Sequence, residues 1–168
     1  MNPFDSAIIN FLQGYTHRSP FFDTLVYLVV ESNLFKGGVV MAIFWWLWFR
    51  YSDQVLAHET RERLIATMMG AIIAVMVGKI LGDLFPFRFR PMNEPGLHFI
   101  VPFGTPEAEV AGWKSHDSFP SDHAALFFSL AAGILLASRG LGIFLLCYYA
   151  IIIGVGRVYC GVHHPTDV

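Results

Sequence analysis

The sequence predicts an all-α fold, a polytopic bundle of transmembrane helices that forms one domain over residues 1–168. Hydrophobic residues make up 55% of the chain and charged residues only 14%. The mean hydropathy of +0.53 is outside the range of ordinary soluble domains. The stretches 64–78 and 140–156 contain no charged residue at all. A helix of a soluble bundle needs a polar face, so both stretches are expected to lie in a bilayer.

The elements are expected in the following order. Residues 1–19 contain a cluster of apolar side chains that predicts a short amphipathic helix at the membrane interface. Five apolar segments follow, and each is expected to be a membrane-spanning helix: 21–31, 34–49, 63–82, 122–138 and 140–157. Their uncharged cores are short against the ~20 residues that a span needs. The lack of a polar face in two of them therefore decides between a membrane and a soluble bundle.

The connection over residues 86–119 contains five prolines and several glycines. This composition excludes a long helix and predicts a loop that could cover a site. Arginines predict the side on which this loop lies. Arg50, Arg61 and Arg63 flank the connection between the second and third segments, and Arg139 lies between the fourth and fifth. Positive charge favours the cytoplasm, so residues 86–119 are expected on the outer face.

Charge and cysteine content exclude other classes of protein. A net charge of −2 without a basic tract argues against a nucleic acid partner. Two cysteines are too few for a disulfide framework and lack the spacing of metal ligands, and no H-E-x-x-H motif is present. We therefore expect neither a cofactor nor a metal. The sequence does not indicate an oligomeric state.

Two polar segments at the ends of apolar runs carry the chemistry. The first is Ser-Phe-Pro-Ser-Asp-His at 118–123, where a loop becomes a helix. Ser121 or Asp122 is expected to be the N-cap, so that free backbone N–H groups can hold an anion. His123, in the first turn, could donate a proton to the leaving oxygen of a phosphate ester.

The second segment has the spacing R-x5-H-x3-D, formed by Arg157, His163 and Asp167. Pro165 fits the first position of a new helix, which would place Asp167 one turn from His163, close enough to orient its imidazole. The other ring nitrogen would then be free to attack phosphorus, and Arg157 could hold phosphate oxygens. His164 competes for this role, but its place beside Pro165 favours a helix cap or a surface position.

These two segments resemble the motifs of the type 2 phosphatidic acid phosphatase superfamily, over about residues 79–168. The resemblance implies a membrane lipid phosphatase with His163 as the nucleophile that becomes phosphohistidine, Asp167 as its orienting partner and His123 as the general acid. It also implies a phosphate cradle of Arg157, Arg90 and the Ser121 region. The substrate is then a lipid phosphate, and the site faces the outside or periplasm from a bacterial-type plasma membrane.

Three positions depart from the family pattern. Asp122 replaces a glycine, as in the undecaprenyl diphosphate phosphatase branch, which favours undecaprenyl diphosphate as substrate. Gly156 stands where the family has serine before its arginine. Asp83 stands where the family has a lysine. Arg88 is the expected replacement cation, because Arg88 and Arg90 can lie on one side of an extended strand. Lys79 is a weaker candidate, since it can pair with Asp83 one turn away.

The family normally places a sixth span after the position of Val168, so five spans of an expected six are visible and a truncated form is expected. Two other functions stay open. A phosphotransferase would pass the phosphoryl group from His163 to an acceptor other than water. A non-catalytic binding or transport protein would use the same histidines and arginines to hold an anionic lipid headgroup.

Overall fold

The computed structural model describes residues 2–113 and 116–168, so Lys114 and Ser115 of the predicted 86–119 loop lie outside the described residues. All regular secondary structure in these ranges is helical. The α-helices are α1 (Pro3–Gln13), α2 (Pro20–Glu31), α3 (Val39–Phe49), α4 (Gln54–Leu84), α5 (Glu107–Gly112), α6 (Asp122–Ala137), α7 (Arg139–Tyr149) and α8 (Gly156–Tyr159). Two π-helical turns are η1 (Leu34–Gly38) and η4 (Ala150–Val155), and two 3₁₀ turns are η2 (Pro91–Asn93) and η5 (Pro165–Asp167).

Short polar side chains begin the principal helices. The side chains of Asn2, Ser19, Asp53 and Ser121 accept hydrogen bonds from backbone N–H groups in the first turns of α1, α2, α4 and α6. Prolines follow directly at the starts of α1 and α2, where their missing N–H costs nothing. The cap at Asp53 explains why α4 begins nine residues before the predicted 63. Hydropathy detects where a helix becomes apolar, whereas the cap determines where it begins.

Two helices are long and apolar enough to cross a membrane: α4, with 31 residues, and the continuous helix Arg139–Tyr159, with 21. The predicted segments 21–31 and 34–49 form a pair bent by 57°, and counting this pair as one span gives three. The helix α6 has only 16 residues. All five predicted segments are thus helical, but five separate spans remain a prediction. Along α4, large apolar side chains such as Met68, Ile72 and Met76 are exposed, as expected for contact with lipid.

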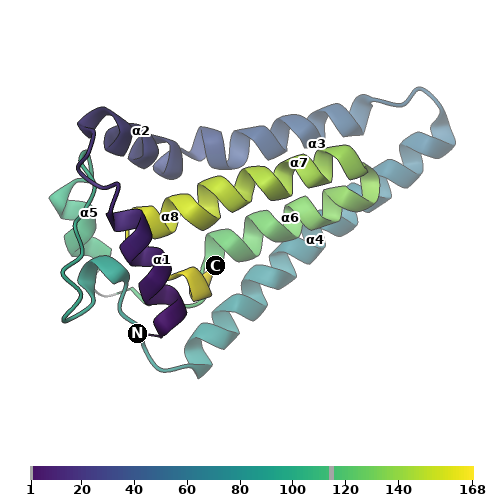
Figure 1. The fold of residues 1–168 in the computed structure, drawn as a ribbon. Coiled ribbons are helices and arrows are strands. Elements are labelled where there is room, and N and C mark those ends of the chain that lie inside the picture. The colour runs from purple at the N-terminus through teal and green to yellow at the C-terminus, as the bar shows by residue number, and fades with distance from the viewer. Residues whose placement is uncertain (1, 114–115) are drawn as a thin grey trace.

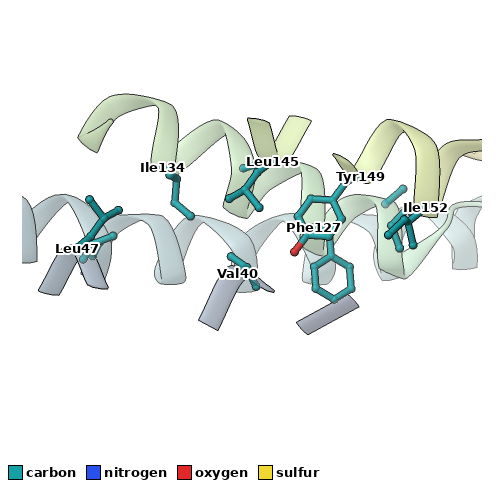
Figure 2. Packing of buried hydrophobic residues seen from close by; sticks show 11 residues of the cluster. Val40, Leu47, Phe127, Ile134, Leu145, Tyr149 and Ile152 are labelled. Atoms are coloured by element: carbon teal, nitrogen blue, oxygen red, sulfur yellow. The ribbon is translucent and has the colours of Figure 1, made fainter. Parts of the chain in front are cut away.

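The core lies between α3, α4, α6 and α7 and consists of aliphatic and aromatic side chains, among them Val40, Leu47, Phe127, Ile134, Leu145 and Tyr149 (Figure 2). Glycines let these helices approach closely. A Cβ atom at Gly133 of α6 would lie 2.3 Å from Thr67 Cγ2 of α4. A Cβ at Gly142 of α7 would lie 2.4 Å from Leu135 Cα of α6. This small-residue packing brings α6 close to both α4 and α7.

The connections separate into two ends (Figure 1). The α3–α4 and α6–α7 connections lie at one end of the bundle. The arginines used to predict orientation are in or near these connections, since Arg61 and Arg63 belong to the first turns of α4 and Arg139 begins α7. Both termini, α1, α5, α8 and the segment between α4 and α6 gather at the other. The predicted chemical residues at 121–123 and 157–167 belong to this second end. The structure therefore places them opposite the arginine-bearing connections.

Candidate active site

His163 is the centre of the candidate site. It follows α8 and a turn in which Gly161 has φ +72°, a conformation that glycine adopts without strain. The residue is 3% exposed. The Nδ1–H group donates a 2.7 Å hydrogen bond to the backbone carbonyl of Ser118. This contact defines the tautomer and leaves the lone pair of Nε2 available.

Positive charge surrounds this imidazole. Burial lowers the pKa of His163 well below its ordinary value, and the charges of Arg157, Arg90 and His123 lower it further. The same interactions show that the two predicted histidines and two of the predicted arginines lie within electrostatic reach of one another. The ring is therefore neutral at physiological pH, which is the state that a nucleophile requires.

Asp167 reaches the His163 ring through Ser118 and not directly. The Oγ–H of Ser118 donates a 2.6 Å bond to Asp167 Oδ2, while the Ser118 carbonyl holds His163. Asp167 also accepts a 2.8 Å bond from the backbone N–H of His164, because the turn η5 folds its carboxylate back over its own start. No hydrogen bond joins Asp167 to the His163 ring in the described parts of the chain. The spacing of four residues correctly predicted proximity but not the intervening serine.

Arg88, the expected replacement cation, is bound to carboxylates. One of its amino groups pairs with Asp167, and the other lies 2.6 Å from Asp5 Oδ2 of α1. Thr166 Oγ1 accepts a further bond of 2.9 Å from Arg88. Burial raises the pKa of Asp5, but the hydrogen bonds from Thr166 and Arg88 outweigh this effect, so that the net pKa is lowered. The structure thus gives Arg88 a bridging role between α1 and η5, which sequence spacing could not reveal.

Arg90 and Arg157 keep donor groups free. In the described residues, Arg90 Nε and Nη1 and Arg157 Nε and Nη1 are buried without a hydrogen-bond partner. Arg157 is 4% exposed. Arg90 lies over the Trp113 ring, 5.3 Å from its centroid, and its other amino group donates to Asp117 O at 3.4 Å. Burial and the charge of Arg157 lower the pKa of Arg90 to about 10, so it remains a cation at neutral pH. Unpartnered guanidinium donors beside a neutral imidazole form a receptor for an anion.

The start of α6 agrees with the predicted cap. Ser121 is 1% exposed, and its Oγ accepts a 3.4 Å bond from the Ala124 N–H. The backbone N–H of Ser121 donates to Asp167 O at 3.0 Å, which ties this helix end to η5. Asp122 is exposed, whereas His123 is half-buried, and both line a pocket of about 310 Å³. Of the two residues expected to cap the helix, Ser121 is confirmed.

Three other candidates differ from expectation. Lys79 and Asp83 are both exposed on α4, and no ion pair joins them within residues 2–113 and 116–168. His164 caps η5 as expected, but it is buried and donates through Nε2 to Phe89 O at 3.0 Å.

No cluster of three or more His, Cys, Asp or Glu side chains in the described ranges could hold a metal ion.

Sequence reasoning missed Lys36 and Glu31, at the bend between α2 and α3. Lys36 is 4% exposed, and its Nζ lies 3.5 Å from Glu31 Oε2. The other carboxylate oxygen of Glu31 lies 3.7 Å from Arg157 Nη1. A single cation inside an apolar run was the signal that could have identified Lys36, because buried charge in a membrane helix is costly.

Comparison with known proteins gives the family and several relatives of this chain. Residues 63–168 match the model of the PAP2 superfamily. The Bacillus licheniformis protein named bacitracin transport permease protein BcrC is 29% identical over 147 residues, 86% of this chain and 62% of that relative. YbjG of Escherichia coli (strain K12) is 28% identical over 141 residues, 84% of this chain and 62% of the relative. The undecaprenyl-diphosphatase BcrC of Bacillus subtilis (strain 168) is 24% identical over 164 residues, 96% of this chain and 73% of the relative.

This chain therefore spans 62% of the length of the first two relatives. No solved structure matches it. The region that matches the family model contains every residue predicted for the site, from Lys79 to Asp167.

Proposed function

We propose that this chain, which belongs to the PAP2 superfamily, is a membrane phosphatase that hydrolyses a lipid-linked phosphate through a phosphohistidine. One observation carries the proposal: the buried His163 ring, fixed through Nδ1, is within electrostatic reach of Arg157 and Arg90, whose buried donors have no hydrogen-bond partner in the described chain. A neutral nucleophile in an anion receptor suits attack on a phosphate. Undecaprenyl diphosphate is the preferred substrate, in line with the name of the Bacillus subtilis relative and with Asp122.

The reaction has two steps. In the first, His163 Nε2 forms a bond to the terminal phosphorus while the bond from phosphorus to the leaving oxygen breaks, and His123 supplies a proton to that oxygen. In the second, a water molecule attacks the phosphohistidine, its proton passes to His123, and the P–N bond breaks to release inorganic phosphate. Both histidines return to their starting states, so atoms and protons balance over the cycle.

The remaining site residues stabilise charge and geometry. Arg157 and Arg90 neutralise the negative charge that the phosphoryl oxygens carry in the transition state. Ser121 begins α6 and directs its first backbone N–H groups toward the same phosphate. Asp167 positions the nucleophile indirectly, because it fixes Ser118, whose carbonyl fixes the His163 ring.

Membrane topology follows the positive-inside rule in this proposal. The bent α2–α3 pair, α4, α6 and the continuous α7–α8 helix act as four spans, one fewer than the sequence predicted, because the bonds of Asp5 to Thr166 place α1 and η5 on the same side. The helix α1 lies at the interface. The arginine-bearing connections are cytoplasmic, and the site opens on the outer face of a bacterial-type plasma membrane. The segment 86–119 then covers the site from outside.

Substitution of the nucleophile tests the proposal. We expect His163→Ala to reduce phosphate release from undecaprenyl diphosphate by at least ~10³-fold, as for other covalent nucleophiles. Phosphatidic acid and phosphatidylglycerol phosphate serve as alternative substrates in the same detergent assay. His58→Ala is the matched control, because His58 is exposed at the opposite end of α4. Turnover by His163→Ala at the wild-type rate would exclude the assignment, and phosphate transfer to an added acceptor without release would indicate a phosphotransferase.

A further inference from the structure

Lys36 lies at a break in the helix pair that leads into the core. The helix Pro20–Glu31 meets the helix Leu34–Phe49 at 57°, and Leu34–Gly38 forms a π-helical turn at the start of the second helix. Lys36 is the only cation between residues 20 and 49. Burying an ammonium group in such an apolar run is expensive, and π-helical turns are frequent at functional sites. A tolerated buried cation in this position requires an electrostatic reason.

The long ion pair between Lys36 and Glu31 leaves the charge of Lys36 incompletely satisfied. Its Nζ lies 3.5 Å from Glu31 Oε2, and Glu31 Oε1 lies 3.7 Å from Arg157 Nη1. Charge-assisted hydrogen bonds are normally ~2.7–2.9 Å long, so one carboxylate is shared loosely between two cations. Arg157, 4% exposed, also has Nε and Nη1 without a hydrogen-bond partner among the described residues. The group thus has capacity for a second anion.

A pocket of about 310 Å³ connects Lys36 to the proposed general acid. Lys36 lines it together with His123 and Asp122, and its walls continue with the apolar side chains Val75, Leu126 and Phe127. His163 is absent from the residues that line this pocket. Lys36 and His123 therefore share a pocket that His163 does not line.

This arrangement separates the two halves of a reacting diphosphate. The nucleophile His163 takes the terminal phosphoryl group, and His123 protonates the bridging oxygen. The lipid monophosphate that leaves then enters the pocket that His123 shares with Lys36, which offers a cation and the apolar side chains Val75, Leu126 and Phe127 for a lipid chain. Asp122 would repel that second phosphate, so a cation is needed between them.

We propose that Lys36 binds the phosphate that stays on the lipid, so that this pocket selects diphosphates over monophosphates. The inference rests on the proposed phosphatase function. When the bridging P–O bond breaks, its electron pair passes to the bridging oxygen, which takes the proton of His123. Lys36 balances the charge of the departing monophosphate. A monophosphate substrate has an uncharged alcohol as its leaving group and gains nothing from Lys36.

The test compares two substrates with one prenyl chain, farnesyl diphosphate and farnesyl monophosphate, with purified protein in detergent. We expect Lys36→Met to lower kcat/KM for the diphosphate ~100-fold and to change that for the monophosphate by less than ~3-fold. Lys36→Arg should restore most of the preference, since it keeps the charge. Arg139→Met is the matched loss of an exposed cation and should change neither value. If the ion pair of Lys36 acted only on folding, its loss would lower kcat/KM equally for both substrates.

Each other outcome has a defined meaning. Equal losses for both substrates, or no loss, overturn the role of Lys36 and leave the proposed phosphatase intact. Failure of the wild-type protein to release phosphate from either substrate overturns the proposed function and the inference with it. If Lys36→Met does not fold, the double variant Glu31→Gln/Lys36→Met replaces it. This variant exchanges both charged side chains of the pair for neutral ones, so no unpaired charge is left. The same change in substrate preference is expected from that variant.

Discussion

At the scale of single residues, the site depends on which groups have partners and which do not. Arg88 and Arg90 are two positions apart, yet Arg88 is bound by Asp5 and Asp167, whereas Arg90 keeps buried donors free in the described chain. Sequence spacing gave both arginines the same role. The difference arises from contacts with α1, which no local pattern encodes. A free donor beside a neutral imidazole is therefore a better sign of phosphate binding than the motif position alone.

The charge on Arg90 should also appear in the pH dependence. Burial, Arg157 and Arg90 hold the pKa of His163 below its ordinary value. Removal of one cation by Arg90→Gln raises that pKa, so the nucleophile becomes protonated at a higher pH. We expect the acidic limb of the kcat/KM profile to move upward by ~1 pH unit. Stopped phosphate-release assays between pH 4 and 8 (~0.5-unit steps) measure it.

The control for this shift is Arg139→Gln, because Arg139 is exposed at the opposite end of the bundle. Its acidic limb should coincide with that of the wild type. Loss of a phosphate-binding arginine also lowers the overall rate. That loss does not change the pH at which the acidic limb of the profile lies, so the two effects can be separated. An unchanged limb in Arg90→Gln would show that Arg90 does not act on His163.

The serine between Asp167 and His163 makes a second residue-scale prediction. Ser118→Ala removes the Oγ that bonds Asp167 but keeps the backbone carbonyl that holds His163. We expect kcat to fall ~10-fold, as when an outer hydrogen bond that orients a reactive group is lost. His163→Ala, measured in the same assay, should lower kcat far more. A loss as large as that of His163→Ala would mean that Ser118 itself takes part in the chemistry.

At the scale of elements, apolar pattern and caps predicted much of the fold. All five segments chosen by hydropathy are helical, and the N-cap expected at 121 or 122 is Ser121. The 57° bend between Glu31 and Leu34 and the π-helical turn that follows it were not foreseen, because neither has a simple sequence signature. The charged side chain at Lys36 marked the place, but a lone lysine does not reveal which helix it faces. Pairing between elements 40 or more residues apart, such as Ser118 with His163, also has no local signal.

Close packing of α4 on α6 gives an element-scale prediction. A Cβ at Gly133 would lie 2.3 Å from Thr67 Cγ2 and 2.7 Å from Thr67 Cβ, and no side-chain rotation can move the second atom. We expect Gly133→Ala to destabilise the protein by about 1–3 kcal/mol, the cost of overpacking a core. Unfolding in detergent, followed by circular dichroism, measures this change in the free energy of unfolding.

Gly70→Ala is the matched control, because Gly70 lies in α4 and a Cβ there meets nothing within 4 Å. This variant should be stabilised by about 0.5–1 kcal/mol, since alanine loses less backbone entropy in a helix than glycine. Destabilisation of both variants by the same amount would show that the α4–α6 contact is not tight at Gly133.

At the scale of the whole molecule, one ion-pair network joins the two ends of the described chain. Asp5 of α1 binds Arg88 and also accepts bonds from the Thr166 N–H at 3.0 Å and the Thr166 hydroxyl at 2.9 Å. Arg88 bonds Asp167 as well. The amphipathic first helix is therefore tied to the turn that positions the proposed nucleophile. Both carboxylate side chains are fully buried, so their charges depend on Arg88 for compensation.

Loss of Arg88 should consequently destabilise the whole fold. Arg88→Met leaves Asp5 and Asp167 buried without their common cation, and we expect a loss of about 3–5 kcal/mol, as for other broken buried ion pairs. Asp5→Asn/Arg88→Met should recover part of the loss, because it removes one stranded charge. The pKa of Asp5 is lowered in the folded state, so its contribution is present above its unfolded pKa and disappears as pH falls through the folded value. Arg88→Met should therefore lose its disadvantage only below the ordinary aspartate pKa of 3.8. An equal deficit at pH values of about 2 and 8 would show that the carboxylates do not depend on Arg88.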